Sequence, residues 1–114
     1  MPYFVRIQLS EVNRDKYSAL HNGMEHAGFR REITGVDGNR YWLPHGEYYF
    51  EGTGTEHDVH LKAATAVVDA GVEDTPQMLI TVADNFWYAG LMRVQLKLTK
   101  ESLASALSKI TSRK

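Results

Sequence analysis

Apolar and polar side chains alternate along the first residues of the chain. Tyr3, Val5, Ile7 and Leu9 fall on one side of an extended segment, and the residues between them fall on the other. Because successive side chains of a strand point to opposite faces of a sheet, this alternation predicts a half-buried strand. We expect its apolar face to pack on helices.

Two later segments repeat their apolar residues at helical spacing. The first begins near Asn13, which can cap a helix, and ends at Gly28, a typical helix stop. The second begins at Thr55, with Asp58 three residues later as in a capping box, and ends at Gly71. Their apolar stripes are Tyr17, Leu20, Met24 and Ala27, then Val59, Ala63, Ala66, Val67 and Ala70.

The remaining strands are predicted from shorter alternations. The second strand covers 29–36, with Phe29 and Ile33 on one face and Arg30 and Glu32 on the other. Asp-Gly at 37–38 favours a hairpin turn. The further strands are predicted at 40–43, 47–51, 78–83 and 86–98, and a terminal helix at 100–111.

This order of elements predicts an α+β fold of the ferredoxin-like type, β-α-β-β-α-β, with an additional C-terminal strand and helix. The chain of 114 residues suits a single domain, 1–114, whose core covers about 2–98. With no cysteine, it has neither disulfides nor thiolate ligands. No apolar run is long enough to cross a bilayer, and no signal peptide is expected, so we predict a cytoplasmic protein.

The segment HGEYYFEGTGTEHDVH at 45–60 gathers three of the five histidines. A zinc site needs further ligands beside His57 and His60, and HDVH is not the HExxH motif. The alternative is a set of polar residues at a helix start, where Asp58 has a capping role. We expect no metal and no cofactor, because phosphate-loop motifs are also absent.

Four stretches resemble the GhoS-like family: PYFVRIQL, YSALHNGMEHAGF, DGNRYWLPHGEYYFEG and VHLKAATAV. The resemblance covers about residues 2–92. That family is known for the endoribonuclease antitoxin of type V toxin–antitoxin pairs of bacteria, which cleaves the messenger RNA of a small membrane toxin. The resemblance implies a compact ferredoxin-like sheet with two helices, similar in outline to the small nuclease subunit of CRISPR adaptation complexes.

The sheet face opposite the helices is the predicted RNA surface. If Tyr48 and Phe50 face the helices, Tyr49 and Phe4 lie on adjacent central strands of the open face. Exposed rings there can stack on unpaired bases, and Arg6 can bind phosphate. The alternative is that a second subunit or the terminal helix covers this face, and the basic-glycine-aromatic signature of RNA-recognition modules is missing.

Metal-independent RNA cleavage needs proton transfer and positive charge at the phosphate. We predict His21 for the first and Arg30 and Arg31 for the second, with His21 as a solvent-facing helix residue in the alternative. Two hypotheses follow: an RNA-binding endoribonuclease antitoxin, or a non-catalytic dimerising or partner-binding module. Single-stranded RNA and a second copy of the chain are the expected partners, and neither a membrane nor a specific DNA sequence is expected.

Overall fold

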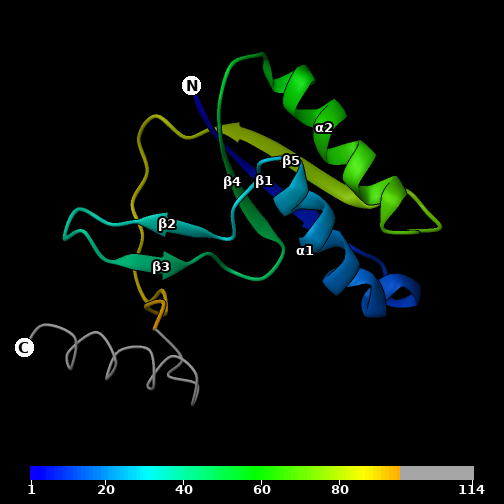
Figure 1. Ribbon diagram of the computed structural model, residues 1–114, viewed down its shortest axis with the longest axis horizontal. Helices are drawn as coiled ribbons and strands as arrows, with labels where there is room; N and C mark the ends of the chain where they lie inside the picture. Colours follow the sequence, from blue (N-terminus) through cyan, green and yellow to red (C-terminus); the bar gives the residue numbers. More distant parts are fainter. Residues whose placement is uncertain (96–114) are drawn as a thin grey trace, which may run out of the picture.

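The computed structural model describes residues 1–95 and shows a small mixed α+β arrangement (Figure 1). A three-stranded antiparallel sheet, a separate two-stranded hairpin and two α-helices make up the described part of the chain. None of the helices within residues 1–95 has the length and apolar character that crossing a membrane requires. In chain order the elements are β1 (Pro2–Gln8), the 3-10 helix η1 (Glu11–Lys16), α1 (Tyr17–His26), β2 (Glu32–Thr34), β3 (Arg40–Trp42), β4 (Glu47–Glu51), α2 (Glu56–Asp69) and β5 (Gln77–Val82).

The main sheet has β1 at its centre, with β4 on one side and β5 on the other, both antiparallel to it. Phe4 of β1 lies opposite Tyr49 of β4 and Thr81 of β5. The predicted adjacency of the first strand and the 47–51 strand is therefore confirmed. Because the register pairs Phe4 with Tyr49, their side chains share one face of the sheet.

The other face of this sheet carries the hydrophobic core. Tyr3, Val5 and Ile7 of β1 are buried together with Tyr48 and Phe50 of β4, as the alternation predicts. The helices α1 and α2 pack against these side chains through the buried members of their stripes, Leu20, Met24, Val59, Ala63, Ala66 and Val67. Burial of a large apolar side chain stabilises a fold by about 1.5–3 kcal/mol, so this layer dominates the stability of the domain.

The predicted end of α1 at Gly28 and the predicted start of α2 at Thr55 are confirmed. The Thr55 hydroxyl accepts the Asp58 amide at 3.3 Å, and the Asp58 carboxylate accepts the Thr55 amide at 2.8 Å. This reciprocal pair is a capping box. Gly28 has a φ of 96°, which is strained for other residues, and it ends α1 by letting the Phe29 amide bond back to Met24.

The predicted helix cap at Asn13 is wrong. A 3-10 helix precedes α1, and Asn13 lies inside it, fully buried. Its amide nitrogen donates to Asp74 at 2.7 Å and to Ser10 at 3.1 Å, while its oxygen accepts the Glu73 amide at 3.2 Å. Asn13 thus ties the start of the first helix to the loop between α2 and β5.

The predicted strand at 29–36 is divided into two parts. Arg30 forms a single antiparallel bridge with Tyr49 of β4, and the chain bends at Arg31 before β2 begins. β2 then pairs with β3 through the predicted turn, in which Gly38 has a φ of 82°. As a result Ile33 is buried outside the main core, and the expectation that it shares a face with Phe29 is wrong.

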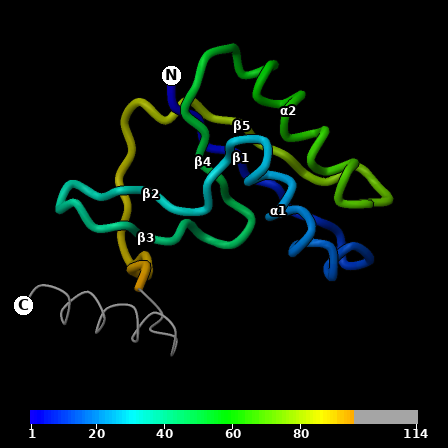
Figure 2. Tube along the Cα trace, in the orientation of Figure 1, coloured from blue at the N-terminus to red at the C-terminus, as the bar shows by residue number. Residues whose placement is uncertain are grey.

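The predicted strand at 86–98 is wrong for its described part. After β5 the chain runs past the β2–β3 hairpin without regular structure (Figure 2), and Gly90 adopts a φ of 73°. Further on, the Met92 carbonyl accepts the Trp42 amide and the Val94 amide donates to Arg40, so this segment pairs with β3. Residues 96–98 and the predicted helix at 100–111 lie outside the described residues.

Candidate nucleic-acid interface

A cleft of about 520 Å³ lies where the end of α1 meets the hairpin. The three predicted catalytic residues, His21, Arg30 and Arg31, all line it. Its lining also contains Arg40 and Trp42 of β3, which were not predicted from the sequence, and two carboxylates, Glu25 and Glu32. We name this feature the arginine cleft.

Backbone contacts fix the two adjacent arginines at the rim of the arginine cleft. The Arg30 amide donates to the Tyr49 carbonyl at 2.8 Å, and the Tyr49 amide donates back at 2.7 Å. The carbonyl of Arg31 accepts the Leu43 amide at 2.8 Å, so the bend is held on both sides. The Arg31 guanidinium lies 5.4 Å from the centre of the Trp42 ring, within the range of a cation–π contact.

The charges of the arginine cleft leave two guanidinium groups available. Arg40 forms an ion pair with Glu32 across the hairpin. Within residues 1–95, neither Arg30 nor Arg31 has a carboxylate within ion-pair distance. Both side chains are exposed, so an anion reaches them without displacing a partner.

A hydrogen bond holds His21, a half-buried residue in the lining of the arginine cleft. Its Nδ1 lies 2.6 Å from the hydroxyl of Tyr48, a fully buried residue of β4. Burial, then the nearby Arg31 and His45, lower the pKa of His21 to about 4, so its ring is neutral at neutral pH. Burial also raises the pKa of Tyr48, which keeps its phenol protonated.

The hydrogen bond between these two side chains favours one tautomer of His21. His21 is the hydrogen-bond partner found for the Tyr48 hydroxyl within residues 1–95, and we infer that the hydroxyl donates to Nδ1, because this arrangement gives the buried phenol proton an acceptor. In this tautomer Nε2 carries the imidazole proton and is a hydrogen-bond donor. His45 packs nearby in an edge-on contact with Tyr17, with 4.3 Å between the two ring centroids. His26, in contrast, is exposed on α1.

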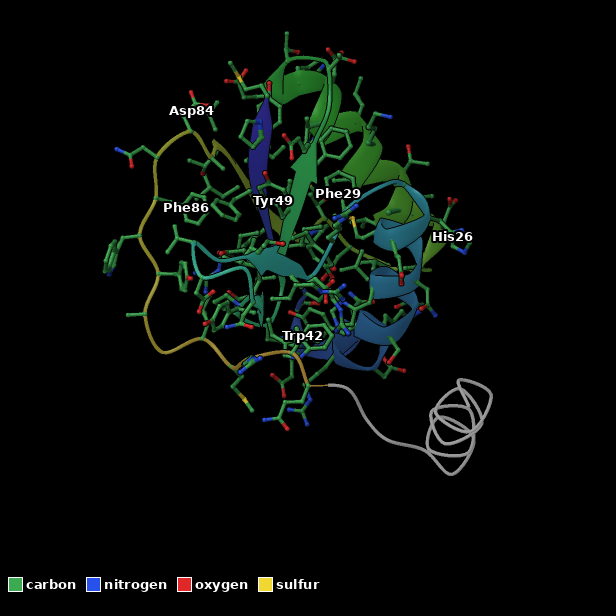
Figure 3. The ribbon with its side chains drawn as sticks, turned by 60° about the vertical axis from the view of Figure 1, so that its left-hand side comes forward. His26, Phe29, Trp42, Tyr49, Asp84 and Phe86 are labelled. Atoms are coloured by element: carbon green, nitrogen blue, oxygen red, sulfur yellow. The ribbon has the colours of Figure 1, made fainter. Side chains whose placement is uncertain are left out.

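The open face of the main sheet carries a row of aromatic rings (Figure 3). Phe4 lies edge-on to Tyr49, with centroids 5.7 Å apart, and edge-on to Phe86 at 4.7 Å. Phe86 therefore covers part of the predicted stacking ring Phe4, which is half-buried. The third predicted RNA-binding residue, Arg6, is exposed on the same face of β1.

A second depression, of about 370 Å³, lies between this face, the hairpin and the chain after β5. We name it the aromatic groove; Phe4, Ile33, Leu43, Glu47, Phe86 and Trp87 line it. A smaller hollow of about 210 Å³ borders on both features, because Arg30 also lines the arginine cleft and Phe86 also lines the aromatic groove. The aromatic groove was not predicted, because the sequence pattern of residues 86–98 favours a strand there.

The histidines of the 45–60 segment do not converge. His57 and His60 are exposed at the start of α2, with ring centroids 6.2 Å apart, and Asp58 is occupied by the capping box. Within residues 1–95 no three His, Cys, Asp or Glu side chains are grouped closely enough to hold a metal ion. His45 lies apart from them, beside Tyr17 and His21.

Comparison of the chain with models of protein families and with curated proteins finds no match. The resemblance to the GhoS-like family and the activity that it implies therefore stay predictions, and the proposal below rests on the geometry of the described residues.

Proposed function

We propose that the protein binds single-stranded RNA through the arginine cleft and the adjoining open face of the sheet. The observation that supports this most is the position of Arg30 and Arg31, two exposed guanidinium groups without a carboxylate partner within residues 1–95. Phosphate groups repeat along the backbone of RNA, and guanidinium groups bind phosphate through paired N–H donors.

Aromatic rings beside these arginines favour a single strand over a duplex. Trp42, in the arginine cleft, is 39% exposed. Phe86, which lines the smaller hollow together with Arg30, is 44% exposed. Unpaired bases stack on exposed rings, whereas the bases of a duplex are already stacked on each other. A single-stranded RNA bound to Arg30 and Arg31 therefore has Trp42 on one side and Phe86 on the other for base stacking.

The state of His21 favours binding over cleavage at neutral pH. With Nδ1 engaged by Tyr48, its Nε2–H is placed to donate to a phosphate oxygen rather than to remove a proton. A pKa of about 4 also makes a poor general base near neutrality. Endoribonuclease activity as an antitoxin of the cytoplasm, directed at a toxin messenger, stays a prediction from the resemblance.

A ferredoxin-like topology is part of the same proposal. Two observations support it: the sheet order β5-β1-β4, and the single bridge of Arg30 to the outer side of β4, where this fold has its fourth strand. Both helices pack on one face, which leaves the opposite face for a ligand.

The test is fluorescence anisotropy of a labelled uridine-rich single strand, with the variants Arg30→Ala and Arg31→Ala. Each should weaken binding by about tenfold and reduce the salt slope by about 0.7, the value for one lost phosphate contact on a single strand. Arg14→Ala is the matched control, because it removes an exposed arginine that pairs with Glu11 outside the cleft. It should bind like the unmodified protein.

Two results and one companion assay are informative in this experiment. Equal losses for Arg14→Ala and Arg31→Ala would contradict a localised site. Incubation of the same RNA in EDTA, followed by gel electrophoresis, separates binding from cleavage. Absence of RNA binding together with a dimer in light scattering would favour the second candidate function, self-association. The exposed apolar side chains of Leu79 and Trp87 support that candidate.

A further inference from the structure

We propose that the aromatic groove binds one unpaired guanine base of the RNA, with the Glu47 carboxylate accepting hydrogen bonds from its N1–H and N2–H groups. This specificity rests on the proposed function, because the base is delivered by the strand that Arg30 and Arg31 hold. It concerns a different part of the surface and different residues.

Glu47 is an acceptor placed among apolar groups. It is the first residue of β4, it is half-buried, and Phe4, Phe86 and Trp87 line the same groove. Within residues 1–95 its carboxylate has no hydrogen bond and no ion pair. A carboxylate in such surroundings is stabilised by a ligand that supplies N–H donors.

The pattern of donors on the bases selects guanine. A carboxylate presents two acceptor oxygens side by side, and guanine alone offers two adjacent donors, N1–H and N2–H, on its Watson–Crick edge. Adenine and cytosine offer one amino group beside a ring nitrogen whose lone pair would face the second carboxylate oxygen. Uracil offers a single N–H between two carbonyl groups, which the carboxylate also repels. Single-stranded RNA exposes these edges for such recognition.

The walls of the aromatic groove suit a planar ring. Trp87 is 92% exposed, so its indole face is available for stacking, and Phe4 and Phe86 form an edge-on pair beside it. The volume of about 370 Å³ lies in the range of small-ligand sites. Stacking on an aromatic side chain adds affinity that is independent of the base, so Glu47 determines the selectivity for guanine.

The route from the phosphate contacts to the groove is short. The hollow of about 210 Å³ has Arg30 and Phe86 in its lining, and these residues also belong to the arginine cleft and to the aromatic groove, respectively. Glu32 and Glu51 also line this hollow, whereas Glu47 lies in the aromatic groove beyond Phe86. An RNA strand with a phosphate on Arg30 can therefore pass its next base through the hollow into the aromatic groove.

The test compares decauridine with the same RNA carrying one central guanosine, by anisotropy at constant salt. The guanosine strand should bind about tenfold more tightly, the discrimination expected for a bidentate contact. Inosine at that position lacks the N2 amino group and should fall between the two. Glu47→Gln should lose the preference, because an amide replaces one acceptor oxygen with a donor.

Glu51→Gln is the matched control, since it removes the same charge from the same face of β4 at a residue that does not line the aromatic groove. It should keep the preference. If Glu47→Gln does not fold, as judged by circular dichroism, Glu47→Asp replaces it: this variant keeps the charge but shortens the side chain, so its carboxylate no longer reaches both donors and the preference should also be lost. Equal binding of all strands, or a preference retained in Glu47→Gln, would overturn the guanine site alone. Failure of every strand to bind would overturn the proposed function as well.

Discussion

His21 shows how burial decides the chemistry of a single side chain. From sequence it has an ordinary histidine pKa and a place on a helix, and both an acid–base role and a solvent-facing role are open. In the structure it contacts the buried hydroxyl of Tyr48, and the neighbouring Arg31 disfavours its protonation. The residue is therefore a neutral hydrogen-bond donor at the cleft.

The lowered pKa of His21 predicts a loss of stability in acid. The unfolded chain protonates this histidine below about pH 6.5, while the folded protein resists protonation until about pH 4. Because the unfolded state binds more protons between these values, stability should fall as the pH is lowered through this window and be constant above it. His21→Gln does not titrate and keeps an acceptor for Tyr48, so its stability should fall less.

The measurement is urea unfolding of both proteins between pH 4 and pH 8. The other four histidines are common to both, so the difference between the two curves isolates His21. Parallel curves would contradict the lowered pKa.

At the scale of elements, local signals were sufficient for the helix ends and the hairpin. Thr55, Asp58 and Gly28 act within a few residues of themselves, and each has its predicted role. Asn13 does not, because its partner Asp74 lies 61 positions away and no local pattern connects the two. For the same reason residues 86–95 were assigned to a strand, although their contacts are with β3 and the sheet face.

Removal of the Asn13 side chain should destabilise the protein strongly. Asn13→Ala removes a fully buried side chain and its hydrogen bonds to the Glu73 amide and the Asp74 carboxylate, at a cost of about 0.5–1.5 kcal/mol for each bond. Asn22→Ala is the control, because Asn22 is exposed on α1. Chemical denaturation should show a change for Asn13→Ala and almost none for Asn22→Ala. Equal midpoints for all three proteins would show that the tie contributes nothing.

At the scale of the whole molecule, some residues of the candidate site were predicted from the sequence and others were not. Arg30, Arg31 and His21 were found together because a helix end and the bend that follows it keep them close. Tyr49 and Phe4 followed from strand alternation and topology. Trp42 and Trp87 were not assigned, since their positions depend on how the hairpin and the chain after β5 pack on the sheet.

These two tryptophans, the only ones in the chain, allow the central claim to be measured directly. In Trp87→Phe the remaining indole, Trp42, lies in the arginine cleft beside Arg31, so its emission reports on that site alone. Titration with uridine-rich single-stranded RNA should quench Trp42 in a saturable way, and added Arg31→Ala should move the midpoint to an RNA concentration about tenfold higher. RNA that binds by anisotropy while Trp42 emission stays constant would contradict the account.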